Sequence, residues 1–316
     1  MKTALIVACD NAYGLSEDIK LFTVAFEEIG FSVSFTSPNR SLWDRLFSKK
    51  RYDIILHIER VAPGWCRAGR KNLLAPHQER YPRRQIGRLK HIDMVLAKTR
   101  HAEDIFSALG IKTTRTGFTS PDKFIPSIEK NWRGFIHLAG GSTLKGTTDI
   151  LAVWEKHPEW PELILVQKAK HAPKTIPRNV TLHAGYLTEE TLGALRNSSG
   201  IHLCPSQSEG WGHYIMEAMA CGAVVVTTDA PPMNELVSPE TGFLVNYNRT
   251  EPRHLGTNYF VDQAALERTI ETILTTPTTV LAEMGQRARA DFERRRPAFT
   301  RHLKDILDNL IPKGGD

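Results

Sequence analysis

Short apolar runs alternate with amphipathic segments along the first 120 residues. Runs that predict buried strands lie at residues 3–9, 31–35, 52–58, 72–75 and 93–97. The apolar positions of 16–29 recur every three or four residues, which predicts a helix ended by Gly30, and a shorter helix is predicted over 101–109. This alternation predicts a mostly parallel sheet with helices on both faces.

The pattern breaks at 120–131 (SPDKFIPSIEKN), a stretch rich in proline and charge that predicts an interdomain linker. The alternation then restarts. Strands are predicted at 134–139, 162–167, 180–183, 201–205 and 223–228, and helices at 147–156, 189–196, 213–221, 263–275 and 280–310. The sequence therefore predicts two α/β domains in tandem, each a doubly wound parallel sheet that binds ligands beyond the carboxyl ends of its strands.

Composition excludes several classes of protein. The 316 residues are 41% hydrophobic and 24% charged, as in globular chains, and no apolar run approaches the roughly 20 residues of a membrane helix. Residues 3–9 resemble a short signal sequence ending at Cys9, but the run is short and Asp10 follows at once, which favours a first strand. The four cysteines lack C-x-x-C spacing, so we expect neither zinc nor disulfides and a cytoplasmic location.

Positive charge is concentrated in two stretches. The net charge is +6, yet residues 60–100 hold eleven lysines and arginines against two acids, and residues 287–304 hold seven against two. Such concentration points to an anionic partner, namely a phosphate, a nucleic acid or a membrane surface. A solvated basic face without a partner is the alternative.

Residues 206–237 (SQSEGWGHYIMEAMACGAVVVTTDAPPMNELV) combine a predicted strand end, a glycine-bearing loop and a helix start. Gly210 and Gly212 permit close approach of the backbone, and the first N–H groups of the following helix suit a phosphate or sugar hydroxyls. Glu209 and Glu217, with seven residues between them, offer carboxylates that accept hydrogen bonds from vicinal hydroxyls.

This segment, from Glu209 through E-A-M-A-C-G-A-V-V-V, resembles the donor-site signature of retaining glycosyltransferases of family 4, which have the GT-B fold. The resemblance implies two Rossmann-like domains facing a cleft. It implies an acceptor domain at 1–125, a nucleotide-sugar donor domain at 132–285, and a C-terminal helix within 286–316 that crosses back to the first domain.

The resemblance also assigns roles in the donor domain. Glu209 would bind the transferred sugar, Glu217 the ribose, and Lys145 the diphosphate. The other donor-binding positions are Gly140, Gly141, Gly210, Trp211, Gly212, His213 and Tyr214. The family's arginine, five or six residues before the lysine, is absent here, where Ala139 and Gly140 stand. Lys168 and Lys170 follow a predicted strand and would compensate, and a solvated turn is the alternative for both.

The first domain carries weaker signals. Gly14, between the first strand and the first helix, would line the cleft and is a further candidate donor-binding residue. His77 ends a predicted strand and resembles a family histidine that contacts the sugar's hydroxymethyl group; a surface-loop histidine is the alternative. Candidate acceptor-binding residues are Arg67, Arg70, Arg83 and Arg84.

We therefore expect transfer of a sugar from a UDP- or GDP-type donor to an acceptor hydroxyl, with retention of configuration and without a metal or cofactor. Glu209, His77 and Lys145 are the candidate catalytic residues. The acceptor would be a lipid-linked glycan at a membrane surface, a phosphorylated small molecule, or a hydroxylated base in DNA. A non-catalytic nucleotide-sugar-binding protein and a nucleotide-sugar epimerase are alternatives from other classes.

Overall fold

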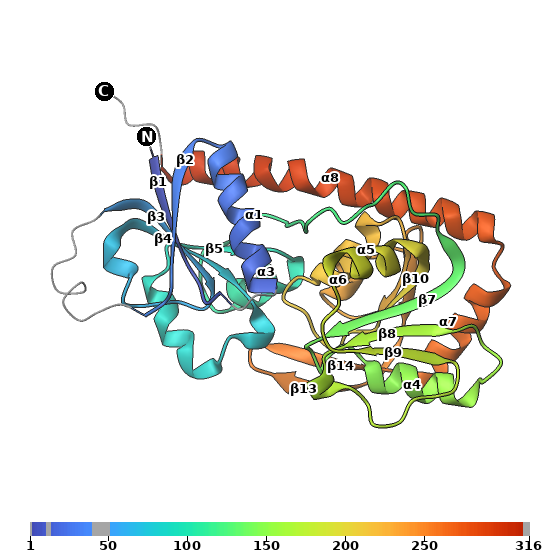
Figure 1. The fold of residues 1–316 in the computed structure, drawn as a ribbon. Coiled ribbons are helices and arrows are strands. Elements are labelled where there is room, and N and C mark those ends of the chain that lie inside the picture. Colours follow the sequence, from blue (N-terminus) through green and yellow to red (C-terminus); the bar gives the residue numbers. More distant parts are fainter. Residues whose placement is uncertain (1, 11–13, 40–50, 312–316) are drawn as a thin grey trace. The chain divides into compact units, whose positions relative to one another are not determined.

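The chain divides into two compact units, each built around one six-stranded sheet (Figure 1). The computed structural model describes residues 2–10, 14–39 and 51–311. Unit 1 consists of Met1–Ser120, Arg253–Gly256 and Arg294–Asp316, and unit 2 consists of Pro121–Pro252 and Thr257–Glu293. Residues 116–130, which include most of the predicted linker, form no helix or strand.

The sheet of unit 1 is parallel throughout, with strand order β2-β1-β3-β4-β5-β6. Its strands are β1 (Lys2–Val7), β2 (Phe31–Thr36), β3 (Tyr52–Glu59), β4 (Gly69–Pro76), β5 (Met94–Ala97) and β6 (Thr113–Arg115). Its helices are α1 (Gly14–Glu28) and α3 (Arg100–Ala108), with 3-10 turns η1 (Cys66–Ala68), η2 (Gln78–Arg80) and η3 (Arg83–His91). All five predicted strands are present. The sequence missed β6 because its three polar residues give no apolar run.

The sheet of unit 2 is also parallel, with order β12-β11-β10-β7-β8-β9. Its strands are β7 (Asn131–Gly140), β8 (Leu163–Gln167), β9 (Val180–Ala184), β10 (Ser199–Cys204), β11 (Val224–Thr228) and β12 (Gly242–Val245). Its helices are α4 (Thr147–Lys156), α5 (Glu189–Ser198), α6 (His213–Ala220) and α7 (Gln263–Thr275). A hairpin of β13 (Tyr247–Arg253) and β14 (Gly256–Val261) follows β12.

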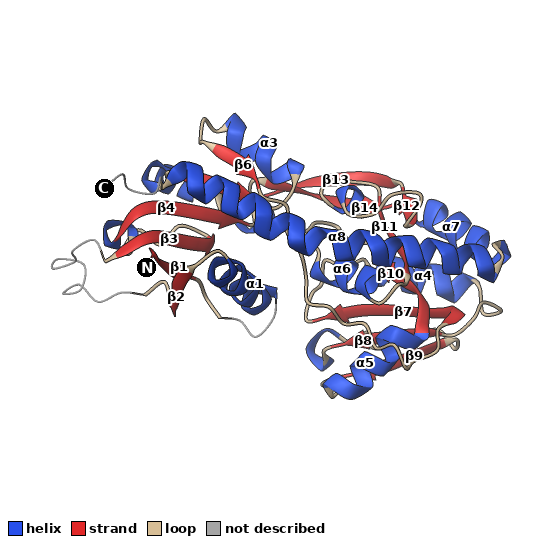
Figure 2. Cartoon of the chain, turned by 90° about the horizontal axis from the view of Figure 1, so that it is seen from above, coloured by secondary structure: helices blue, strands red, loops and turns tan. Residues whose placement is uncertain are grey.

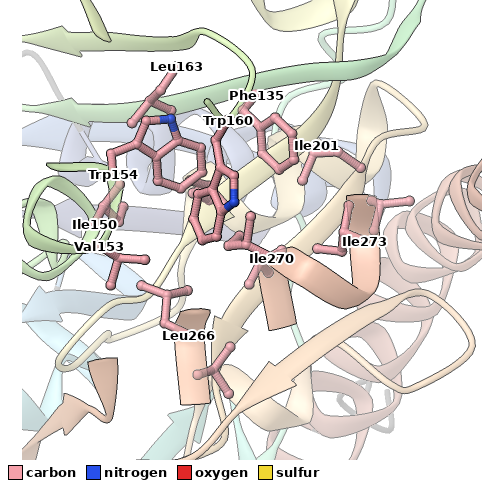
Figure 3. Close-up of a cluster of buried hydrophobic side chains, with 14 of the residues drawn as sticks. Phe135, Ile150, Val153, Trp154, Trp160, Leu163, Ile201, Leu266, Ile270 and Ile273 are labelled. Carbon is pink, nitrogen blue, oxygen red and sulfur yellow. The ribbon is translucent and has the colours of Figure 1, made fainter. Parts of the chain in front are cut away.

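The core of unit 2 combines aliphatic side chains with the large rings of Phe135, Trp154 and Trp160 (Figure 3). Trp154 of α4 contacts Phe135 of β7 and Trp160, with ring centroids 5.5 Å and 5.1 Å apart in edge-on arrangements. Ile270 of α7 packs in the same cluster. This burial fixes α4, and with it the loop before α4, against the sheet.

Helix α8 (Thr278–Leu310) contributes to both units, with residues up to Glu293 in unit 2 and residues from Arg294 in unit 1 (Figure 2). In unit 1 its Phe299 is 2% exposed and meets the rings of Phe22 in α1 and Phe118, at centroid distances of 5.4 Å and 4.9 Å. The helix is therefore part of the unit 1 core. Among the helices of the described ranges, none is long and apolar enough to cross a membrane.

Candidate functional site

The strand order of unit 2 places two loops at a topological switch point. β7 and β10 are neighbours, but the chain continues from β7 toward β8 and from β10 toward β11. The loops that follow these two strands therefore diverge and leave a crevice at the carboxyl ends, where ligands bind in such sheets. Lys145 lies in the first loop and Glu209 in the second.

The two loops are joined through their backbones. The Gln207 N–H donates to the carbonyl of Leu144 at 2.9 Å. Gly146, at the start of α4, has a φ of +72°, and a Cβ there would lie 2.4 Å from the carbonyl oxygen of Pro205. Only glycine permits this approach without a shift of the backbone. The contact holds the Lys145 loop against the Glu209 loop.

Lys145 and Glu209 form a mostly buried ion pair. The Lys145 Nζ lies 2.5 Å from Glu209 Oε1, and the side chains are 16% and 12% exposed. The ammonium also lies 3.4 Å from the ring centroid of Tyr214. The positive charge is thus held between a carboxylate and an aromatic face at the switch point.

A hydroxyl chain orients the Glu209 carboxylate. Ser206 Oγ donates to Glu209 Oε1 at 2.5 Å and lies 2.5 Å from the hydroxyl of Tyr214. Burial raises the pKa of Tyr214 well above its ordinary value, so the phenol stays protonated and donates to Ser206. Sequence reasoning missed Ser206, because a serine after a strand carries no spacing signal of its own.

Helix α6 begins at the same loop. Gly212 precedes its first turn with a φ of +101°, and a Cβ there would lie 3.7 Å from Glu209 Cγ. The first N–H groups of a helix have no acceptor within it, and the helix dipole adds partial positive charge. His213 and Tyr214 form the first two positions, while Gly210 and Trp211 are buried in the loop beneath them. The first turn of α6 thus directly follows the loop that carries Glu209.

Glu217 lies one turn into α6 and pairs with Arg196 of α5. Arg196 Nη2 is 3.3 Å from Glu217 Oε2, and the side chains are 6% and 16% exposed. Arg196 was not predicted, since its partner lies 21 positions away in another helix. The pair holds the Glu217 carboxylate beside a buried guanidinium and leaves it partly accessible.

A buried histidine, His137, forms a hydrogen bond at the end of the loop that carries Lys145. His137 Nδ1 donates to the carbonyl of Leu203 at 2.7 Å, so its Nε2 accepts from Thr147 Oγ1 at 2.9 Å. Burial lowers the pKa of His137 to about 4, so the ring is neutral at pH 7. Thr147 is the first residue of α4, two positions after Lys145. No spacing or motif in the sequence indicates this role.

Lys168 lies beside Gly140 and Gly141, at the end of β7. Its backbone N–H donates to the carbonyl of Gly140 at 2.9 Å. A Cβ on Gly141 would lie 3.2 Å from Lys168 Cδ and 3.8 Å from its Nζ. The side chain therefore passes over Gly141, near the position where the resemblance leads one to expect an arginine.

The site residues predicted in unit 1 lie at both ends of its sheet. Gly14 is the first residue of α1, and residues 11–13 of the loop before it lie outside the described residues. His77 directly follows β4, and its Nε2 lies 2.9 Å from Asp18 Oδ2 and 3.0 Å from Lys98 Nζ. It is therefore not an isolated surface-loop histidine.

The four arginines predicted to bind the acceptor are not brought together. Arg67 lies in η1, just before β4. Arg70 is the second residue of β4, and its Nη1 lies 3.4 Å from Asp53 Oδ1. Arg83 and Arg84 come after the carboxyl end of β4. A strand of this length spans roughly 25 Å. Arg67 and Arg70 are therefore far from Arg83 and Arg84 in space, although all four are close in the sequence.

No group of three or more His, Cys, Asp or Glu side chains suited to a metal ion lies within the described ranges 2–10, 14–39 and 51–311.

The whole fold is that of GT-B glycosyltransferases. The glycosyltransferase of Rickettsia africae superposes with a TM-score of 0.77 at 15% identity, covering 99% of both chains. Sucrose-phosphate synthase of Thermosynechococcus elongatus gives 0.75 at 15% identity, covering 98% of this chain and 99% of the other. HepE of Anabaena, solved with UDP and glucose, gives 0.73 at 15% identity, covering 98% of this chain and all of HepE.

The family comparison agrees with this fold. Residues 166–290 match the family model described as glycosyl transferases group 1, and the match includes Glu209 and Glu217. The serotype-specific mannosyltransferase WbdA of Escherichia coli is 25% identical over 166 residues, which are 50% of this chain and 20% of WbdA. The family model therefore matches part of unit 2, while the solved structures match the fold of the whole chain.

Proposed function

We propose that the chain transfers a hexose-like sugar from a UDP- or GDP-type donor to an acceptor hydroxyl, with retention of configuration and without a metal ion, as in family 4. The Lys145–Glu209 pair beside the first turn of α6 is the observation that carries this proposal. In support, a cation, a carboxylate and the start of a helix lie together at the switch point of unit 2. HepE, solved with UDP-glucose, shares this fold and supports a UDP-type donor.

Each group has a chemical task in this proposal. The Lys145 ammonium and the start of α6 neutralise the diphosphate as it leaves, which fixed positive charge does without a metal. Glu209 accepts hydrogen bonds from the sugar, and Glu217 from the ribose. When the donor binds, the Lys145 ammonium turns from the carboxylate of Glu209 toward the phosphates.

Lys168 is proposed as the second cation of the diphosphate site. The aliphatic part of its side chain passes over Gly141, next to the carboxyl end of β7. Its ammonium would therefore supply positive charge near Ala139 and Gly140, where the family arginine is absent. A lysine acts there as a point charge and lacks the two-pronged grip of an arginine. We expect weaker discrimination between diphosphate geometries as a result.

Retention is supported by the state of Asp18, the carboxylate next to His77. Its Oδ2 lies 2.5 Å from Lys98 Nζ, and both side chains are fully buried. An inverting enzyme needs a carboxylate or imidazole that removes a proton from the acceptor. A buried carboxylate engaged with an ammonium does not suit that task.

The acceptor is proposed to be anionic, such as a lipid-linked or phosphorylated glycan, and to bind arginines at the carboxyl edge of the unit 1 sheet. Arg83 Nε donates to the carbonyl of His254 at 3.1 Å. Burial and the nearby charges of Arg253, Arg60, Arg80 and Arg84 lower the pKa of His254. The charges of these arginines act on the turn at His254 and make its surroundings positive.

A donor and acceptor panel tests the function. The purified protein is incubated with UDP-glucose, UDP-N-acetylglucosamine and GDP-mannose, with neutral, phosphorylated or lipid-linked sugars, or with DNA that carries hydroxymethylated bases. We expect release of the nucleotide diphosphate that depends on an anionic acceptor, and NMR of the product shows retention. Donor binding without release indicates a binding protein, and conversion of the donor sugar without an acceptor indicates an epimerase.

Variants test the site. Lys145→Ala and Glu209→Gln are expected to lower kcat/KM about 10²-fold or more, because each removes charge stabilisation of the departing diphosphate or a hydrogen bond to the sugar. Lys168→Ala is expected to raise the donor KM. Lys174→Ala, an exposed lysine after the same strand, is the control. Full transfer activity in both the Lys145 and Glu209 variants overturns the site assignment.

A further inference from the structure

Unit 1 buries a lysine where the fold does not require one. Lys98 directly follows β5 and is fully buried, as is Asp18 of α1, and Lys98 Nζ lies 2.5 Å from Asp18 Oδ2. Burial lowers the pKa of Lys98, while the carboxylate of Asp18 opposes this effect. Buried ion pairs often contribute little net stability compared with apolar residues of the same size. The pair therefore calls for another explanation.

The three N–H groups of the Lys98 ammonium match three acceptors. One is Asp18 Oδ2 at 2.5 Å, the second is the ring of Phe118, whose centroid is 4.3 Å from Nζ, and the third is His77 Nε2 at 3.0 Å. A donor left without an acceptor in this buried place would cost about 1–3 kcal/mol. The match requires that His77 Nε2 carry no proton.

The alternative arrangement satisfies fewer groups. If Nε2 carried a proton, it would donate to Asp18 Oδ2 at 2.9 Å, but its hydrogen would then face an ammonium 3.0 Å away. Lys98 would also lose its third acceptor. The neutral His77 ring therefore holds its proton on Nδ1.

We propose that Lys98, paired with Asp18, is a positioning residue that holds His77 as a neutral Nδ1–H donor toward a substrate oxygen. His77 is 12% exposed, so one part of the ring remains accessible while Nε2 faces the buried pair. A ring fixed in this way donates a hydrogen bond to a hydroxyl or phosphate oxygen and does not act as a base through Nε2. The substrate part rests on the proposed glycosyl transfer, whereas the tautomer does not.

The test uses the full chain with ¹⁵N-labelled histidine. Two-bond ¹H–¹⁵N spectra report which ring nitrogen is protonated, and the His77→Gln variant assigns the His77 signals. We expect the Nδ1–H form in the wild type. Because Lys98→Met alone leaves Asp18 buried without its ammonium, the Asp18→Leu/Lys98→Met double variant removes both charges and preserves the fold. We expect the Nε2–H form to appear in it, while Lys112→Met, which removes an exposed lysine, leaves the tautomer unchanged.

Kinetics give a second readout. The double variant is expected to lose about 10-fold or more in kcat/KM, and to cause no further loss in a His77→Ala background, because residues that act through one group are not additive. An Nε2–H ring in the wild type, an unchanged tautomer in the double variant, or losses that add to that of His77→Ala would each overturn the proposal. A wild type without transfer activity would instead refute the proposed function, and the spectra alone would then decide the state of His77.

Discussion

Gly146 ties the Lys145 loop to the Glu209 loop through a contact that a larger residue cannot make. Its φ is +72°, and a Cβ would lie 2.4 Å from the Pro205 carbonyl oxygen. We expect Gly146→Ala to lower the free energy of unfolding by roughly 1–3 kcal/mol, from the strained backbone and the shifted loop. It should also lower kcat/KM, because Lys145 moves with the loop. Urea denaturation and the transfer assay measure the two effects.

The matched control is Gly87→Ala. A Cβ at Gly87 meets no atom within 4 Å, and the residue does not have a left-handed backbone. Its unfolding free energy should change by less than about 0.5 kcal/mol. Equal behaviour of the two variants would show that the contact with Pro205 does not hold the loops together.

The two side chains that meet at the switch point, Lys145 and Glu209, could be predicted from the sequence. The residues that orient them and their neighbours through hydrogen bonds or ion pairs could not. The spacing of two glutamates marked Glu209, and the resemblance to a known family implied Lys145; the structure places their charged atoms 2.5 Å apart. Their roles with a donor stay predictions. Ser206, Arg196 and His137 were missed because each acts through a partner on another element, and sequence spacing does not record such pairings.

In unit 1, Phe299 is one of the buried side chains that anchor α8. Phe299 is 2% exposed between the rings of Phe22 and Phe118. Phe299→Ala removes both ring contacts and leaves a cavity, so we expect a loss of about 3–5 kcal/mol in the stability of unit 1. Hydrogen exchange of the α1 amides, measured against urea, should show the loss of protection.

Val280→Ala is the control from the same helix, because Val280 is 40% exposed. It should leave the protection of α1 unchanged. If the Phe299 variant retained full protection in α1, the C-terminal half of α8 would not be part of the unit 1 core.

Elements with apolar periodicity could be predicted, and elements without it could not. The helices at 147–156 and 263–275 match α4 and α7 residue for residue, since their apolar residues face the core. The β13–β14 hairpin was missed because Tyr247–Arg253 is almost wholly exposed and polar. Such a strand is specified by its backbone pairing, and its side chains leave no pattern to detect.

At the scale of the whole molecule, alternation of strands and helices predicted the tandem parallel sheets, and the structure confirms them. Strand order is less visible in the sequence. That β7 neighbours β10, and β1 neighbours β3, follows from where each crossover connection returns to its sheet. The switch points, and therefore the exact neighbours of Lys145, became apparent only in three dimensions.

Three buried histidines make the stability of the whole chain depend on pH. Burial lowers the pKa of His57 and His137 to about 4 and that of His202 to about 3, against 6.5 in an unfolded chain. Between pH 6.5 and 4 these histidines therefore bind more protons in the unfolded chain than in the folded one. Their contribution to the free energy of unfolding is fully present above pH 6.5 and is lost as the pH falls. At pH 5 the expected loss is about 2 kcal/mol for each histidine.

Urea denaturation at a series of pH values measures this loss, and His137→Gln should reduce its slope by about one proton. His157 is the opposing control. Its contacts with Glu267 and Glu159 raise its pKa, so it stabilises the fold at low pH, and His157→Gln should leave the acid loss at least as large as in the wild type. In the neutral His137 ring, Nε2 accepts a hydrogen bond from the Thr147 hydroxyl. Protonation of Nε2 breaks this hydrogen bond, which lies next to the loop that carries Lys145. Stability that stayed constant from pH 7 to pH 5 would mean that these rings are not held neutral in the folded chain.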